Sequence, residues 1–147
     1  MNIYEIYEKS EKNFDSLSPI EKNIYVLYDF QTIYEMEGFS HFFRTDRNQH
    51  IPCLMQFLKA IDAPNIQWVE KMVELIDREV PSWEADEIDA FLCEAKEEEI
   101  EDEDEIDSDD RDDWEYWGDQ FYELVDEMWD RVDAYLASKG LGPLEWD

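Results

Sequence analysis

Apolar residues in the C-terminal part of the chain recur at steps of three and four residues. This period places them on one face of an α-helix, which has roughly 3.6 residues per turn. The pattern runs through Phe121, Leu124, Val125, Met128, Trp129, Val132, Tyr135 and Leu136. It predicts one continuous amphipathic helix over this stretch, ended by Gly140 and the Gly142-Pro143 pair.

The same helical period recurs along most of the chain, and no stretch alternates as a β-strand would. Ser18, Pro19 and Glu21 form the signature of a capped helix start, and Gly38 is suited to end that helix. Further helices are predicted over 51–62 and 65–80, and another after Ser82. The sequence therefore predicts an all-α fold, a single compact domain over residues 1–147 with about six amphipathic helices.

Negative charge is concentrated in the second half of the chain. The chain has 41 Asp and Glu residues against 12 Lys and Arg, a formal net charge of −29. Residues 1–80 contain 14 acidic and 8 basic side chains, whereas residues 81–147 contain 27 and 4. Such a surface repels nucleic acid and anionic membranes and attracts basic proteins. We therefore expect a basic protein as the partner, with no direct binding to nucleic acid or to a membrane.

The acidic segment, residues 94–115, contains 15 acidic residues among its 22 positions. Runs of this kind are commonly solvated, disordered linkers. Here Ile100 and Ile106 interrupt the run and Trp114 and Trp117 end it, so apolar side chains are available to order it. We predict an ordered acidic surface, with Trp114 and Trp117 as candidate aromatic anchors for a partner. Its partner-binding carboxylates would be Glu97, Glu98, Glu101, Asp102, Glu105, Asp109, Asp112 and Asp113.

The last predicted helix carries a second acidic feature. Steps of four and three residues place five carboxylates on one stripe: Asp119, Glu123, Asp126, Asp130 and Asp133. Neighbours on such a stripe lie ~5–6 Å apart, and like charges there cost a few tenths of a kcal/mol per pair. Phosphates along a DNA strand are roughly 6–7 Å apart, given their ~3.4 Å axial rise. We predict that the stripe imitates a row of phosphates; a solvated helix face is the alternative interpretation.

Catalytic and metal-binding patterns are not recognisable in the sequence. His41 and His50 are the only histidines, and neither belongs to a known nucleophile signature. Their spacing with Cys53 matches no common zinc site. The Asp-rich stretch from Asp107 does not fit a calcium-binding EF-hand loop, because Gly118 falls where that loop requires a glutamate. The sequence predicts a protein that is not an enzyme and has no metal or cofactor.

The two cysteines, Cys53 and Cys93, lie in apolar helical contexts without the spacing of a disulfide framework. We predict that both are buried, reduced thiols.

The N-terminal residues lack the features of a signal peptide, and no stretch approaches the ~20 apolar residues of a membrane span. The predicted location is the cytoplasm.

Three stretches of the chain resemble a bacterial family of acidic all-α proteins that was long filed as a domain of unknown function. They are IYEMEGFSHFFRTD (33–46), LMQFLKAIDAPNIQWVEKMVELI (54–76) and WGDQFYELVDEMWDRVDAYL (117–136). Glu35, Met36 and Glu37 stand where the family pattern has Asn-Asn-Gly, and Asp62 stands in place of a glycine. The pattern is matched at Gly38, Phe39, Phe42, Phe43, Ile61, Ala63, Phe121 and Tyr122.

The characterised branch of that family acts as DNA mimics. The resemblance implies a helical protein that occupies the DNA-binding face of a bacterial helix-turn-helix transcription factor and so relieves repression. It also implies that Gly38 and the phenylalanines determine the fold and do not contact the partner. An immunity-type inhibitor or chaperone of a basic toxin or other basic protein fits the sequence as an alternative, because it needs the same acidic face. A homodimer is also compatible with the sequence.

Overall fold

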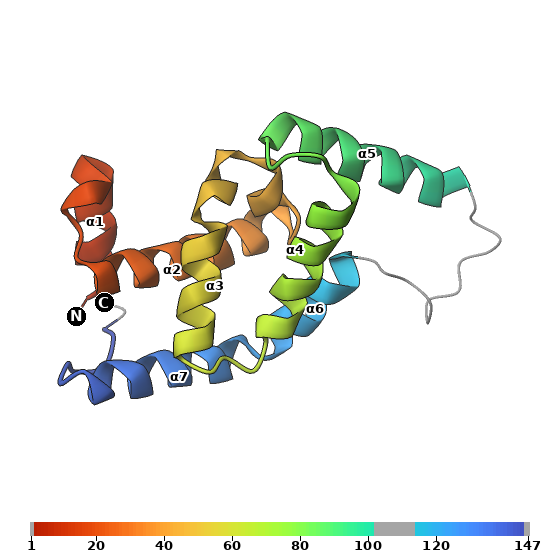
Figure 1. The fold of residues 1–147 in the computed structure, drawn as a ribbon. Coiled ribbons are helices and arrows are strands. Elements are labelled where there is room, and N and C mark those ends of the chain that lie inside the picture. The colour runs from red at the N-terminus through yellow and green to blue at the C-terminus, as the bar shows by residue number, and fades with distance from the viewer. Residues whose placement is uncertain (1, 102–113, 146–147) are drawn as a thin grey trace.

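One long helix, α2 (Pro19–Glu37), runs through the fold, and helices from the N-terminal and C-terminal parts of the chain lie against it (Figure 1). The computed structural model describes residues 2–101 and 114–145. Besides α2, its α-helices are α1 (Ile3–Asn13), α3 (Ile51–Ala60), α4 (Ile66–Glu79), α5 (Ala85–Glu101), α6 (Trp114–Glu123) and α7 (Val125–Ser138). Three 3-10 helices join them: η1 (Phe14–Ser16), η2 (His41–Arg44) and η3 (Asp46–His50). The predicted all-α fold is confirmed.

The predicted helix start at Ser18 is present as a complete capping box. The Glu21 N–H donates to Ser18 Oγ (3.2 Å), and the Ser18 N–H donates to Glu21 Oε1 (3.0 Å). This bond from the Ser18 backbone is the main reason that the pKa of Glu21 is lowered. The helix ends before Gly38, which has a φ of 101° that favours glycine. Both ends of α2 are therefore fixed by local sequence.

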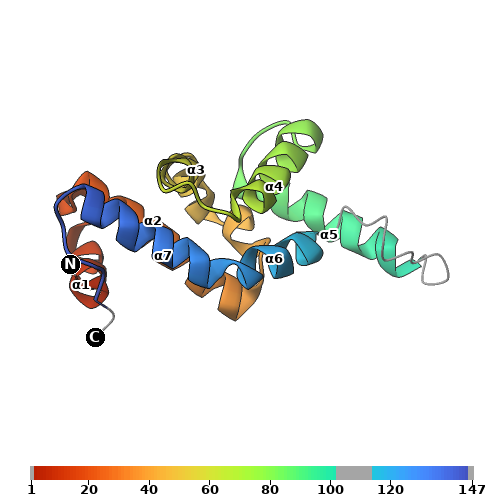
Figure 2. The same ribbon diagram turned by 90° about the horizontal axis from the view of Figure 1, so that it is seen from below.

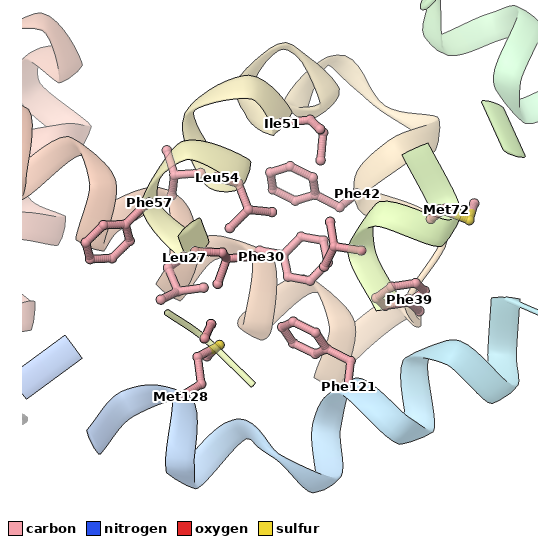
Figure 3. Close-up of a cluster of buried hydrophobic side chains, with 14 of the residues drawn as sticks. Leu27, Phe30, Phe39, Phe42, Ile51, Leu54, Phe57, Met72, Phe121 and Met128 are labelled. Carbon is pink, nitrogen blue, oxygen red and sulfur yellow. The ribbon is translucent and has the colours of Figure 1, made fainter. Parts of the chain in front are cut away.

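Phe30 of α2 lies at the centre of a cluster of buried aromatic rings (Figure 3). Its ring centroid is 5.1 Å from that of Phe42 and 5.3 Å from that of Phe121, both in edge-on geometry. The rings of Phe39 and Phe43 lie 5.8 and 6.0 Å away. Such pairs stabilise a core by about 0.5–1.5 kcal/mol each beyond simple burial. The phenylalanines that match the family pattern thus build the core.

The single last helix predicted from the sequence is wrong: the structure has two, α6 and α7, that meet at Leu124. The Leu124 N–H donates to the Phe121 carbonyl (3.2 Å), three residues back, in place of the four-residue step of an α-helix. The same carbonyl accepts a second hydrogen bond from Nδ2 of the buried Asn65, 3.1 Å away. A side chain distant in sequence therefore stabilises the break, which apolar spacing does not reveal.

The α6–α7 pair runs antiparallel to α2, so the C-terminal part of the chain covers the helix at the centre of the fold (Figure 2). Trp129 of α7 donates from its indole nitrogen to Gln31 of α2. The chain ends also meet, since the Ile3 N–H donates to the Glu145 carbonyl (2.9 Å) beside an isolated bridge between Asn2 and Glu145. The α6–α7 pair is thereby held along much of its length.

Trp114 and Trp117 are core residues, which corrects their prediction as anchors for a partner. Their side chains are only 7% and 5% exposed. They belong to α6, which packs against α4, and the Lys71 ammonium of α4 lies 6.0 Å from the Trp117 ring centroid. Burial of large rings against a neighbouring helix stabilises the fold and leaves almost no surface for another protein.

The two cysteines differ in burial, so the prediction of two buried thiols is wrong for Cys93. Cys53 is half-buried; its thiol donates to Asn23 Oδ1 (3.0 Å), and burial raises its pKa. Cys93 is exposed on α5, where the Arg44 guanidinium donates to its sulfur (3.0 Å). The adjacent Leu92 is the buried residue of this stretch.

Candidate partner-binding surface

The predicted carboxylate stripe is divided between α6 and α7. Asp119 and Glu123 lie on α6, Asp126 and Asp130 lie on α7, and all four are exposed. We call these four the carboxylate row. The fifth predicted member, Asp133, is half-buried and accepts the Leu144 N–H (3.0 Å), so it holds the C-terminal segment in place.

The structure describes only part of the acidic segment, residues 94–115. Glu97, Glu98 and Glu101 fall on the C-terminal end of α5, which extends away from the other helices (Figures 1 and 2). Residues Asp102, Glu105, Asp109, Asp112 and Asp113 lie outside the described residues. The predicted ordered surface of this segment stays a prediction.

Two tyrosine–carboxylate hydrogen bonds cross between α2 and α6. Tyr34 of α2 donates to Asp119 Oδ1 of α6 (3.2 Å), and Tyr122 of α6 donates to Glu35 Oε1 of α2 (2.9 Å). The two rings stack with centroids 5.3 Å apart and planes 20° from parallel. These four residues, the tyrosine–carboxylate cluster, fix α6 against α2 and hold a carboxylate of each helix at the surface.

The electrostatics of this cluster keep both phenols protonated as hydrogen-bond donors. Burial, together with the charge of Asp119, raises the pKa of Tyr34 to about 12. The hydrogen bond to Glu35 raises the pKa of Tyr122. The cluster lines an open hollow next to Phe39. Tyr122 is 42% exposed there, so its ring is an aromatic surface available to a partner.

Sequence reasoning predicted Asp119 as a partner-binding residue, which stays a prediction, but it missed the hydrogen bond of Asp119 to Tyr34 and the neighbouring pair of Glu35 and Tyr122. The sequence showed one sign that Glu35 differs from its relatives: it stands where the family pattern has asparagine. Tyr34 and Asp119 are 85 positions apart, and Glu35 and Tyr122 are 87 apart. No local pattern reports contacts over such separations.

Two carboxylates at this surface occupy a helix end where they are unfavourable. Glu35 and Glu37 lie in the last turn of α2, which has no basic residue. A helix C-terminus carries a partial negative charge, so each nearby carboxylate costs about 0.3–1 kcal/mol. Asp126 and Glu127, in contrast, lie in the first turn of α7, where the helix dipole stabilises them. Because carboxylates at these positions weaken the helix, they favour a role for these residues other than stabilising the fold.

A family model matches residues 15–139, from η1 to the end of α7, and it describes DMP19-like proteins. The chain belongs to the DMP19-like protein family. No curated protein and no solved structure matches the chain significantly. The match includes the aromatic core, both tyrosines of the cluster and the whole carboxylate row.

The basic side chains that the structure describes in this DMP19-like chain form their ion pairs away from the row. Arg131 lies 3.6 Å from Asp62 and 3.8 Å from Glu127. Within residues 2–101 and 114–145, no Lys, Arg or His forms an ion pair with Asp119, Glu123, Asp126 or Asp130. The exposed charge of the row is therefore available to a cationic partner.

His50, one of the two histidines, packs in a structural position in this DMP19-like chain. Its ring lies 5.1 Å from that of Phe14, and burial lowers its pKa.

In the described part of the chain, no three or more His, Cys, Asp and Glu side chains gather closely enough to hold a metal ion. None of the helices there has the length and apolar character needed to cross a membrane.

Proposed function

We propose that the chain binds the DNA-binding surface of a basic bacterial protein, a helix-turn-helix transcription factor, and thereby blocks its binding to DNA. The observation that carries this proposal is the carboxylate row, four exposed acidic side chains without an ion-pair partner among the described residues. Within each helix the two carboxylates of the row are four positions apart, which corresponds to ~5–6 Å. This spacing is close to that of phosphates along a DNA strand, roughly 6–7 Å.

Arginine and lysine side chains of the partner would bind the row through charge-assisted hydrogen bonds. The tyrosine–carboxylate cluster and Asn65 hold α6 and α7 in place, so little conformational freedom is lost on binding. The formal net charge of −29 would accelerate encounter with a basic surface at low ionic strength. Binding and DNA displacement should therefore weaken steeply as salt is added.

The test begins with capture of partners from an extract of the native cells on the immobilised protein at low salt, followed by elution with a salt gradient. Each captured protein is then bound to labelled DNA, and displacement of that DNA is followed by electrophoretic mobility shift. The decisive variant combines Glu123→Gln, Asp126→Asn and Asp130→Asn. Its matched control combines Glu8→Gln, Glu11→Gln and Asp15→Asn, exposed carboxylates in the N-terminal part of the chain.

We expect the wild-type protein and the matched control to displace DNA at similar concentrations. The row variant should need at least a tenfold higher concentration. Equal displacement by the two variants would rule out the row as the binding surface. A captured partner that never binds DNA, such as a basic toxin, would instead support the inhibitor alternative.

A further inference from the structure

A second surface, formed by η3, α3, α4 and the start of α5, contains a groove with two chemically different halves. The apolar half is a hollow of about 530 Å³ lined mainly by Ile51, Pro52, Met55, Val73 and Trp83. Mostly apolar hollows of roughly 300–1,000 Å³ are typical binding sites for ligands and side chains.

The acidic half is an adjoining hollow, also of about 530 Å³, lined by the carboxylates of Asp46, Glu84 and Asp86. Asn48, Gln49 and Trp83 line both hollows, so the two adjoin along a shared wall, and we call them together the groove. In the part of the chain that the structure describes, no basic side chain pairs with these three carboxylates. The groove thus joins an uncovered apolar surface to uncompensated negative charge.

Hydrogen bonds hold the wall shared by the two hollows in position. Asn48 donates from Nδ2 to the carbonyls of Phe43 and Trp83, each at 3.1 Å. The Trp83 indole N–H donates to Asp77 Oδ1 (2.6 Å) at the apolar end of the groove. A wall fixed in this way needs little rearrangement on binding, which reduces the entropy lost.

We infer that this groove binds a peptide segment in which a large apolar side chain lies next to lysine or arginine. The apolar side chain occupies the hollow beside Met55 and Val73, and the cation lies near Glu84 and Asp86. A second copy of this chain is a poor occupant, because each copy carries a formal charge of −29. The groove uses other elements than the carboxylate row, so the inference does not depend on the proposed function.

The test uses two labelled peptides with blocked ends, Ala-Leu-Arg-Arg-Ala and the reversed order Ala-Arg-Arg-Leu-Ala. Each has one control in which Leu is replaced by Ser and another in which both Arg are replaced by Gln. Binding to the full chain is measured by fluorescence anisotropy at low salt. At least one complete peptide should bind fivefold or more tighter than both of its controls. Equal binding of complete and control peptides, or none of either order, would overturn the inference.

Variants of the protein locate the peptide. Glu84→Gln with Asp86→Asn should weaken binding at least fivefold, whereas Glu8→Gln with Asp15→Asn, which removes the same charge elsewhere, should change it little. Gln49→Trp, at an exposed position in the shared wall, should obstruct the groove and weaken binding further. If the groove and control pairs bind alike, the groove is not the site. The triple variant of the carboxylate row should still bind the peptide, which separates this inference from the proposed function.

Discussion

Asn65, a wholly buried polar residue before α4, links that helix to the junction of α6 and α7. Its Nδ2 donates to the Phe121 carbonyl (3.1 Å) and lies 3.4 Å from Met128 Sδ. We expect Asn65→Ala to destabilise the fold. It should also loosen the junction of α6 and α7, which fixes the position of Glu123 relative to Asp126.

The size of this effect follows from the contacts. A buried hydrogen bond contributes about 0.5–1.5 kcal/mol net. The Phe121 carbonyl keeps its bond from the Leu124 N–H (3.2 Å), so it is not left unpaired. Removal of the buried amide also leaves a small cavity, which costs about 1 kcal/mol more. The free energy of unfolding should therefore fall by about 2 kcal/mol, and the melting temperature by about 4–8 °C for a chain of this size.

Asn65→Asp gives a sharper test because its effect depends on pH. The introduced carboxyl can donate to the Phe121 carbonyl only when protonated, and burial raises its pKa above the unfolded value. Its bond should be present in acid and lost as the pH rises through the folded pKa. The loss of stability relative to wild type should thus be larger at pH 7.5 than at pH 4.5, whereas that of Asn65→Ala should change little.

Urea unfolding at both pH values, followed by far-ultraviolet circular dichroism, measures these differences. A loss below 0.5 kcal/mol for Asn65→Ala would contradict the role assigned to this hydrogen bond. So would an Asn65→Asp variant whose difference from wild type is the same at both pH values.

Three further predictions concern the surface between α2 and α6. Gly118→Ala should destabilise the protein by about 1–3 kcal/mol in urea, because the added Cβ would lie 2.6 Å from Phe39 Cβ and 2.7 Å from Tyr34 Cε2. Gly142→Ala, whose Cβ would meet nothing within 4 Å, is the neutral control. Glu37→Gln should raise the free energy of unfolding by about 0.3–1 kcal/mol by removing negative charge from the C-terminus of α2; a gain that persists at high salt would refute this cause. The folded state keeps Tyr34 protonated up to a pKa of about 12, above its ordinary value of 10, so stability should fall as the pH rises through that interval. Tyr34→Phe should flatten the decline in alkaline urea titrations, and an unchanged slope would contradict this.

Local sequence determined most of the helices, the capping box at Ser18 and the end of α2 at Gly38. It also identified much of the core, because apolar spacing and capping act within a few positions of each other. The family pattern even marks one strained turn: Asp62, which stands in place of a glycine, has a positive φ of 54°. At this turn the sequence departs from what the backbone favours.

Only the tertiary structure decided which faces are available to a partner. Helical spacing assigns a residue to a face but does not say what covers that face, so Trp114 and Trp117 are buried and Tyr122 is exposed. The break at Leu124 depends on Asn65, and the tyrosine–carboxylate cluster joins residues more than 80 positions apart. Such contacts exist only after the helices have packed. The sequence therefore determined how much negative charge the chain carries, and the packing of α6 and α7 on α2 decided where part of it is displayed.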